Sequence, residues 1–514
     1  MMQKKDNELF IGIDIGTTLC KCVIIDKDLA VHGSASRRMQ ISVQSGGVVE
    51  QDAEEWWDAC CATISEVLKL SDVKAENVRT IGISSQGISF VPVDKNCTPL
   101  RPAFSWMDMR ASLQTERIRS IIDEKDLFSI TGKRCNAAYT LPKLLWFKEN
   151  EAEIYYKTFK ILMPLDFLIA RFSGEFVTDH TMASGTMLYD IKAGVWSNFL
   201  LEKFDLKKEL LPKLQWSGEP VGTIRKEVAD KLGLPASIII GVGGQDQKIA
   251  AFGAGINKSR ATISLGTAMA ILRQNEEPML DSFMRIPCFA GLAKGSWIIE
   301  GSSDCCNILD WMKATFSPNL DYSGINKLVE TIDQENNSIL ILPFFSGAGS
   351  PFNIQEARGM FSGLDFSVSL AHLFKGFYES IALLIRYNLE VMQEISGSFD
   401  ELRIFGGGAK SNVWCQIIAD ANDKPVSKLV TSEAASIGAA ILGGQSCGYF
   451  IDTALENRRP AEKYEENAIK DKEKRKYYND FINIGTIFQP KEKYKIYYEK
   501  KYREFHNMVE RTLF

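Results

Sequence analysis

Three glycine-containing turns are the parts of this sequence whose residue types and spacing could support chemistry. The first is Gly16-Thr17-Thr18, the second is Gly266-Thr267, and the third is the cluster Gly406-Gly407-Gly408. Glycine lacks the Cβ that would block a close approach, so such turns can direct backbone N–H groups and threonine hydroxyls at an anion. The three turns therefore predict binding of phosphate groups or of a nucleotide.

Two aspartates lie beside such turns. Asp14 ends the first apolar run, where it could hold Mg²⁺ through water molecules, as magnesium prefers; a solvated carboxylate of an ordinary hairpin is the alternative. Asp246 follows Gly243-Gly244-Gln245 at the end of another apolar run. There a carboxylate could act as a general base for a hydroxyl group, or it could cap the following helix, since Asp is a good N-cap. The residues alone leave both roles open.

The apolar runs that carry these turns predict an α/β protein. Residues 9–16 and 21–26 flank the first turn as a predicted hairpin, and residues 261–265 lead into the second turn on the same plan. Residues 402–405 run into the glycine cluster, with a helix predicted from about Ser411. Because a strand followed by a Gly-Thr turn recurs in both halves, we expect two similar domains that divide near residue 253.

Composition excludes several classes of protein. A chain of 514 residues favours two domains, and 45% hydrophobic with 24% charged residues is typical of a globular protein. The formal net charge of -5 gives no basic surface for nucleic acid. No apolar run approaches the roughly 18 residues of a membrane span, and no signal peptide precedes the first strand. We therefore expect a cytoplasmic protein that binds neither nucleic acid nor membrane.

The cysteines and histidines do not suggest a metal or catalytic cluster. None of the eleven cysteines forms a C-x-x-C pair, so we interpret all of them as small core residues in a reducing compartment. The four histidines are far apart, which disfavours a histidine metal site or a Ser-His-Asp triad. No G-x-x-x-x-G-K-[ST] motif occurs, and a dinucleotide-dependent oxidoreductase remains only a weak alternative.

Longer motifs show that the sequence resembles the FGGY carbohydrate kinases. Residues 139–146 are similar to the first family signature, and residues 359–364 with 371–373 and 379–382 are similar to the second. The resemblance covers roughly residues 8–450. It implies two ribonuclease-H-like domains of the actin-like ATPase type with an interdomain cleft. The implied parts are an N-terminal sugar-binding domain at 8–253, a C-terminal nucleotide-binding domain at 254–450, and a C-terminal helical tail at 451–514.

The resemblance also implies a role for each motif. ATP and Mg²⁺ are the expected cofactors, with Asp14 at the metal and Asp246 as the catalytic base that contacts the sugar. The expected nucleotide contacts are Gly16, Thr17, Thr18, Lys21, Gly266, Thr267, Asn307, Gly407, Gly408 and Asn412.

The sugar pocket is expected around Gln86, Trp106, Asp108 and Arg110, although Asp108 and Arg110 could instead form a structural pair. Xylulose kinases of the family carry a histidine where this chain has Ile88. The expected substrate is a small ketose or polyol phosphorylated on a terminal hydroxyl, with xylulose as the first candidate. A kinase for another sugar and a non-catalytic, actin-like nucleotide-binding regulator are the alternatives, and a homodimer is left open.

Overall fold

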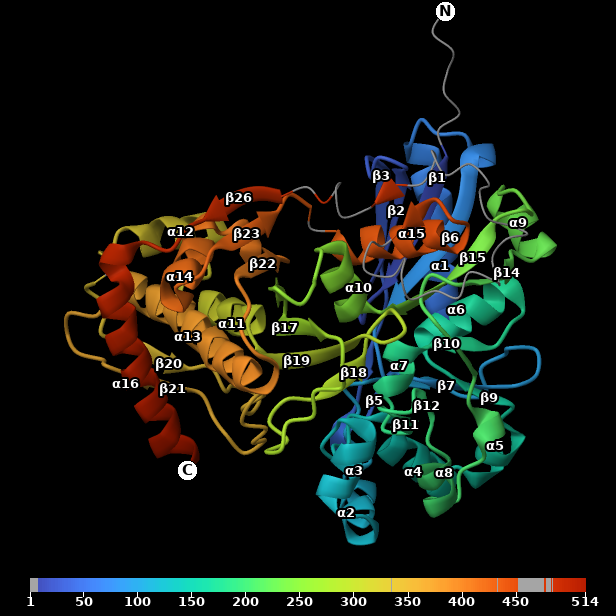
Figure 1. Cartoon of the computed structure of the whole chain (residues 1–514), viewed down its shortest axis with the longest axis horizontal. Helices are drawn as coiled ribbons and strands as arrows, with labels where there is room; N and C mark the ends of the chain where they lie inside the picture. Colours follow the sequence, from blue (N-terminus) through green and yellow to red (C-terminus); the bar gives the residue numbers. More distant parts are fainter. Residues whose placement is uncertain (1–7, 334, 432, 452–475, 478–481, 483) are drawn as a thin grey trace, which may run out of the picture.

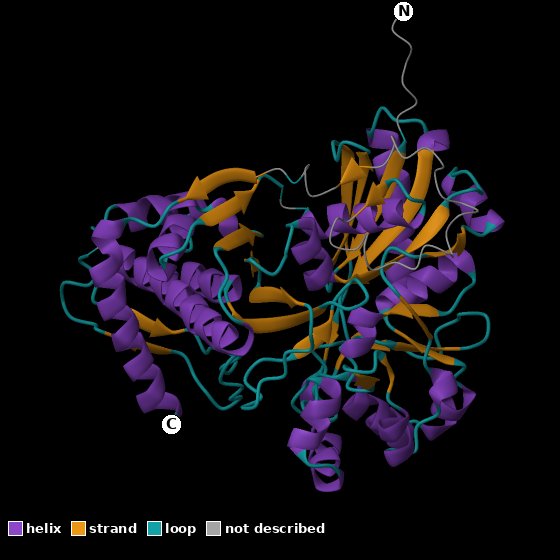
Figure 2. Ribbon diagram, viewed as in Figure 1, coloured by secondary structure: helices purple, strands orange, loops and turns teal. Residues whose placement is uncertain are grey.

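Two mixed β-sheets built on the same strand plan form the centres of two lobes (Figure 1, Figure 2). The computed structural model describes residues 8–333, 335–431, 433–451, 476–477, 482 and 484–514. None of the helices in this described part of the chain combines the length and the apolar character that a membrane span requires.

The first sheet has the strand order β14-β15-β6-β1-β2-β3. Strands β1, β2 and β3 are consecutive antiparallel neighbours, and β6 and β15 join the other side of β1 in parallel. Its bounds are β1 Leu9–Ile15, β2 Leu19–Asp26, β3 Val31–Arg38, β6 Val78–Ser85, β14 Pro220–Thr223 and β15 Ile239–Gln245.

The second sheet has the order β18-β19-β17-β16-β22-β23-β26. Its central part repeats the first sheet, since β19, β17 and β16 are antiparallel neighbours and β22 and β23 continue in parallel. The repeat confirms the α/β class and the duplication predicted from the Gly-Thr turns. The bounds are β16 Arg260–Leu265, β17 Ala268–Asn275, β18 Cys288–Ala290, β19 Trp297–Asp304, β22 Glu401–Phe405, β23 Val426–Leu429 and β26 Ile484–Phe488.

Helices cover both sheets, and small sheets of two or three short strands lie in the connections (Figure 2). The first half of the chain contains α1 Ala53–Leu70, α2 Ser112–Ile121, α3 Glu124–Thr131, α4 Thr140–Asn150, α5 Ala152–Lys157, α6 Pro164–Ser173, α7 His180–Ser184, α8 Asn198–Lys203, α9 Lys226–Leu232 and α10 Asp246–Gly253. The second half contains α11 Cys306–Phe316, α12 Tyr322–Glu330, α13 Leu370–Ser396, α14 Asn412–Asn422, α15 Ala434–Ser446 and α16 Lys495–Leu513. The remaining strands are β4 Ser42–Val43, β5 Val49–Gln51, β7 Val91–Val93, β8 Ala103–Phe104, β9 Lys160–Leu162, β10 Val177–Asp179, β11 Tyr189–Asp190, β12 Val195–Trp196, β13 Lys213–Gln215, β20 Leu340–Leu342, β21 Met360–Ser362, β24 Phe450–Ile451 and β25 Lys476–Tyr477.

Helix α15 packs on the first sheet, although its residues lie within the range 254–450 expected for the second domain. In Figure 1 it lies beside β1, β2 and β6. A Cβ on Gly12 would lie 1.9 Å from the carbonyl oxygen of Ser436, and one on Gly82 would lie 1.8 Å from that of Ala439. Glycine is required at both strand positions because the helix backbone touches the sheet directly. The first sheet is thus covered by α1 on one face and by α15 on the other.

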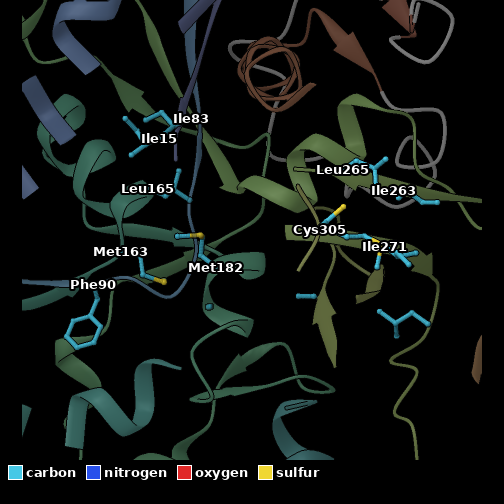
Figure 3. Packing of buried hydrophobic residues seen from close by; sticks show 14 of the residues in the cluster. Ile15, Ile83, Phe90, Met163, Leu165, Met182, Ile263, Leu265, Ile271 and Cys305 are labelled. Atoms are coloured by element: carbon cyan, nitrogen blue, oxygen red, sulfur yellow. The ribbon is translucent and has the colours of Figure 1, made fainter. Parts of the chain in front are cut away.

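Buried aliphatic side chains continue from one sheet to the other. Figure 3 shows Ile15 and Ile83 at the ends of the first-sheet strands, and Ile263 and Ile271 in the second sheet, all completely buried. All eleven cysteines are free, as expected, and nine of them are buried. Cys306 and Cys447 are only partly buried and pack against the margin of the core.

The described residues of the expected C-terminal tail include helix α16 and strand β26. Helix α16 lies against α13, where the buried Lys501 ammonium pairs with the buried Glu379 carboxylate. Strand β26 adds to the edge of the second sheet beside β23. Residues 452–475, 478–481 and 483 of the tail lie outside the described residues.

Candidate active site

The first candidate turn lies at the end of β1, where Asp14 pairs in register with Lys21 of β2. The Ser84 hydroxyl, on neighbouring β6, donates a 2.7 Å hydrogen bond to Asp14 Oδ1. Burial raises the pKa of Asp14 to about 6, against the lowering effects of Ser84 and of the Lys21 cation. Asp14 is half-buried, and these two groups only partly offset the cost of its desolvation, so its ionised form favours a nearby cation.

Asp246 is the first residue of α10, directly after β15. The helix N-cap is Gln245, whose side-chain oxygen accepts the Lys248 N–H at 3.3 Å, so the capping role considered for Asp246 belongs to its neighbour. Asp246 Oδ1 accepts the Gln247 N–H at 2.7 Å. Burial, followed by the negative charge of Asp14, raises the pKa of Asp246 to about 7. A carboxylate with a pKa near neutral is suited to proton transfer at physiological pH.

Sheet register explains why these two carboxylates meet. Ser84 of β6 is paired with Asp14 of β1 on one side and with Gly244 of β15 on the other. Because the three strands are parallel, their carboxyl ends lie at one edge of the sheet. Residues separated by more than 200 positions in the sequence are therefore brought into one site.

Mg²⁺ fits this edge through Asp14. The carboxylate is half-buried and lies near a second negative charge, so a divalent cation would offset an unfavourable electrostatic arrangement. The described residues contain no cluster of three or more His, Cys, Asp or Glu side chains arranged around a metal. Magnesium commonly takes one or two carboxylates and completes its coordination with water and phosphate oxygens.

The second turn, Gly266-Thr267, joins β16 to β17 and contacts the start of α11. The N–H of Cys306 donates to Gly266 O at 3.1 Å, and the N–H of Asn307 donates to Thr267 O at 3.3 Å. Thr267 is exposed and free to meet a ligand. The Asn307 side chain instead binds its own helix terminus, accepting N–H groups of Cys305 and Ile308 at 2.9 Å each. A nucleotide contact by Asn307 would require these bonds to be exchanged.

The third turn follows β22, next to β16, so it lies at the same sheet edge as the second turn. Gly406 adopts a left-handed φ of 95°, which favours glycine. Gly407 is exposed, and a Cβ built on it would meet nothing within 4 Å, which leaves space for a flat ligand. Gly408 is buried, with its Cβ position 2.9 Å from Leu265 Cβ, so its role is packing. Asn412 is exposed at the start of α14, and its Oδ1 accepts from Lys428 at 2.6 Å.

Lys21 is paired in this structure with a residue from the second half of the chain. Its ammonium lies 3.1 Å from Glu433 Oε2, just before α15. Both side chains are about one-third exposed, at 32% and 29%, so this is a weak and exchangeable ion pair. A phosphate that approaches Asp14 and the first turn could therefore compete with Glu433 for Lys21.

Polar side chains connect the first turn to the expected sugar pocket. Trp106 Nε1 donates to Thr17 Oγ1 at 2.9 Å, and Gln51 Nε2 donates to Thr17 O at 2.7 Å. Gln86 Nε2 in turn donates to Gln51 Oε1 at 2.8 Å. The buried Gln86 Oε1 has no hydrogen-bond partner among the described residues, so it is an acceptor available to a hydroxyl group if the side chain rearranges. Trp106 is 40% exposed, as a stacking surface for a sugar would be.

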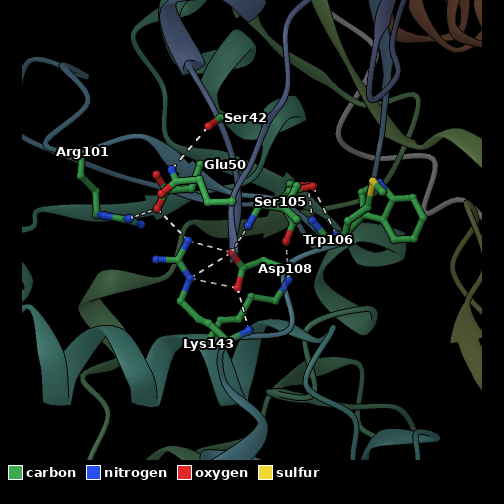
Figure 4. A network of polar contacts seen from close by, with 12 residues as sticks. Ser42, Glu50, Arg101, Ser105, Trp106, Asp108 and Lys143 are labelled. Carbon is green, nitrogen blue, oxygen red and sulfur yellow. Dashed lines mark hydrogen bonds and ion pairs between the residues drawn. The ribbon is translucent and has the colours of Figure 1, made fainter. Parts of the chain in front are cut away.

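Asp108 and Arg110 form a structural pair within the polar network around Asp108, Glu50 and Arg101 that Figure 4 shows. Arg110 binds both oxygens of the completely buried Asp108 carboxylate, and the Val49 N–H donates to Asp108 Oδ2 at 2.7 Å. Arg110 also contacts Glu50, which binds Arg101 in the same network. Since both Asp108 oxygens are already used and inaccessible, we do not include Asp108 or Arg110 among the proposed sugar contacts.

Ile88 lines a cavity of about 490 Å³ whose lining also includes Asn353 and Glu356 from the second half of the chain, but not Gln86, Trp106 or Asp246. Its φ of 55° is unusual for a β-branched residue. Such backbone strain is found most often at ligand-contacting positions. The residue that replaces the histidine of xylulose kinases therefore lies at the wall of an interlobe cavity.

Sequence interpretation missed a charged pair beside Asp246. Lys248 follows it by two residues in α10 and contacts Glu300 of β19. The signal was a lysine within the otherwise small and apolar segment Ile249-Ala250-Ala251-Phe252. Its partner lies 52 residues further along the chain and could not be found from spacing.

Comparison with known proteins agrees with this geometry. Residues 9–253 match the N-terminal domain, and residues 261–447 the C-terminal domain, of the FGGY family of carbohydrate kinases. A xylulose kinase of Bacillus subtilis (strain 168) is 31% identical over 442 residues, which cover 86% of this chain and 88% of that protein. The chain belongs to the FGGY family of carbohydrate kinases.

Solved structures show the same fold. A structure described as a xyloylose kinase from Brucella ovis has a TM-score of 0.85 at 25% identity and covers 97% of this chain and 98% of its own. A structure described as a gluconate kinase from Lactobacillus acidophilus has a TM-score of 0.86 at 22% identity and covers 98% of each chain. The expected two-domain, actin-like ATPase fold is thus confirmed. The protein is a sugar kinase, and family membership implies a sugar and ATP as its substrates.

Proposed function

We propose that this protein transfers the γ-phosphoryl group of ATP to a terminal hydroxyl group of a small ketose or polyol, with xylulose as the first candidate. The observation that carries the proposal is the meeting of Asp246 and Asp14 at one sheet edge, with the pKa of Asp246 raised to about 7. The name shared by relatives such as the Bacillus subtilis protein supports xylulose.

In the proposed mechanism Asp246 accepts the proton of the attacking hydroxyl group. Mg²⁺ held through Asp14 would neutralise phosphate charge when bound. The backbone N–H groups and hydroxyls of the first and second turns donate to phosphate oxygens, and Gly407 with Asn412 lies along the adenosine. Gln86 and Trp106 orient the sugar. Closure of the lobes would exclude water, so that ATP is not hydrolysed without a sugar.

Ile88 refines the proposed substrate. An aliphatic side chain at the cavity wall offers no hydrogen bond to a hydroxyl group, and polar sites discriminate sugars through paired donors and acceptors. We expect the pocket to accept a substrate that carries a shorter or reduced carbon, or a methyl group, at the position that faces Ile88.

The test is ATP-dependent ADP release by the purified protein with pentuloses, hexuloses and polyols, each compared with the sugar-free rate. Asp246→Asn should lower turnover with the best sugar by about 10²–10⁴ and leave ATP binding near normal, since asparagine keeps the shape but accepts no proton. Asp72→Asn, at an exposed position after α1, is the matched control. Near-parental turnover by a folded Asp246→Asn variant would show that Asp246 is not the base. The absence of sugar-stimulated ADP release across the panel would contradict the proposed class of substrate.

A further inference from the structure

A buried ion pair lies beside the proposed base and joins the two lobes. Lys248 belongs to the first turn of α10, and Glu300 belongs to β19 of the second sheet. The lysine ammonium contacts Glu300 Oε2, and the two side chains are only 2% and 13% exposed. The pair therefore connects the helix that begins with Asp246 to the sheet that carries the nucleotide turns.

Aromatic packing holds this pair in place. The ammonium nitrogens of Lys248 and Lys133 each lie 3.6 Å from the centroid of the Phe289 ring, on β18. Lys133 is completely buried and donates to backbone carbonyl groups of Cys288 and Thr131. Cation–π contacts in a dry environment restrict both ammonium groups. The position of Lys248 is thus fixed from the second lobe by Phe289 and Glu300.

A buried ion pair gives little net stability, because removing two charges from water offsets most of their attraction. Apolar residues of similar volume would hold α10 against β19 at least as well. The charged groups that face Asp246 are Asp14 from β1, Lys248 from its own helix and Glu300 from β19. Lys248 favours the ionised carboxylate, while Asp14 and Glu300 oppose it.

We propose that Lys248 and Glu300 form a positioning pair for Asp246, which orients the first turn of α10 toward the cleft and balances the charge around the base. This inference rests on the proposed function, since it assigns Asp246 the role of base. Neither member of the pair needs to contact the sugar. The pair acts by keeping one cation and one anion at fixed places next to the carboxylate.

Changing the two members one at a time should have opposite effects on the ionisation of Asp246. Lys248→Met removes the cation and leaves the Glu300 anion, so Asp246 should ionise at higher pH. Glu300→Gln removes the anion and leaves the cation, so Asp246 should ionise at lower pH. If the pair only stabilised the fold, both variants would lose activity, and the pH at which Asp246 ionises would not shift in opposite directions.

The experiment measures kcat with saturating Mg-ATP and the best sugar between about pH 5.5 and 9. We expect the midpoint of the acid limb of the kcat profile to rise by about 1 pH unit in Lys248→Met and to fall by a similar amount in Glu300→Gln. A shift of this size is typical for the removal of one nearby unit charge. Titration of ATP itself is common to all variants and cancels in the comparison. Lys248→Arg keeps the charge and should retain the parental limb.

Two further variants complete the test. The double variant Lys248→Met/Glu300→Gln should bring the limb back toward its parental position. Burial lowers the pKa of Lys133, the other lysine on Phe289, to about 7, so Lys133 titrates in the same window; Lys133→Met removes this titration and should move the limb less than Lys248→Met does. If Lys248→Met does not fold, the opposite shift of Glu300→Gln and the retention by Lys248→Arg still decide the question. Shifts in the same direction, or no shift in Glu300→Gln, would overturn the proposal. Failure of the base assignment itself would appear separately, as full turnover by Asp246→Asn.

Discussion

Replacing Asp246 by Asn should raise the free energy of unfolding above that of the parent at alkaline pH and leave it unchanged at acidic pH. The pKa of Asp246 is raised from 3.8 to about 7 in the folded protein. Between these two values the folded state holds a proton that the unfolded state has lost, so the free energy of unfolding falls as pH rises through this window. Above about pH 7 the folded parent must keep a charged carboxylate in a half-buried place.

The size of the effect follows from the pKa difference. A shift of about three units corresponds to at most about 4 kcal/mol at 1.36 kcal/mol per unit. Because water can enter an open cleft and reduce the cost of the charge, we expect about 1–3 kcal/mol. Asparagine resembles the protonated carboxyl group and keeps no charge. The variant should therefore match the parent near pH 4 and exceed it at pH 8.

The assay is urea unfolding of parent and Asp246→Asn at both pH values, without nucleotide or metal. Asp72→Asn, at an exposed position, controls for the general effect of removing one negative charge. If Asp246→Asn gains no stability at pH 8, or gains the same amount at pH 4, the carboxylate is not held at a raised pKa. The reasoning from burial and from the Asp14 charge would then be wrong.

Two further substitutions test the ligand sites. Gly407→Val places a side chain in open space at a φ of -61°, so the fold should survive, as a thermal melt would verify. The affinity for ATP, measured by titration, should fall roughly tenfold or more because the side chain occupies the space proposed for adenosine. Unchanged affinity would place the adenosine elsewhere. Ile88→His should raise kcat/KM for xylulose relative to the other sugars, and Ile88→Asn, which equally tolerates the left-handed backbone, is the control. A parent that already prefers xylulose would refute the argument from Ile88.

The sequence was sufficient to predict the elements whose signals are local. Apolar runs ending in glycine turns correspond to β1, β16 and β22, and Ser411 caps α14 through its hydroxyl group as its position suggests. Strand ends and turns depend on a few neighbouring residues, which explains this agreement. Parallel pairing then placed Asp14 and Asp246 together without any further signal.

Features that depend on distant packing could not be predicted. The polar residues of the Trp106-Met107-Asp108 segment look equally accessible in the sequence, but the structure buries Asp108 completely and leaves Trp106 40% exposed. Lys248 and Glu300 meet only because two sheets are docked. The sequence also did not predict that α15 packs on the first sheet, although the glycines in that helix were a signal of close backbone contact.

The crossing of α15 onto the first sheet has a consequence for the order in which the protein can be made. A ribosome adds about 5–20 residues per second, so tens of seconds separate the synthesis of β1 from that of α15. Until residue 446 has emerged, the bare face around Gly12 and Gly82 lacks the helix that covers it. The amino-terminal lobe is therefore not complete as an early unit, because the first sheet lacks this helix from the synthesis of β15 at residue 245 until residue 446 has emerged.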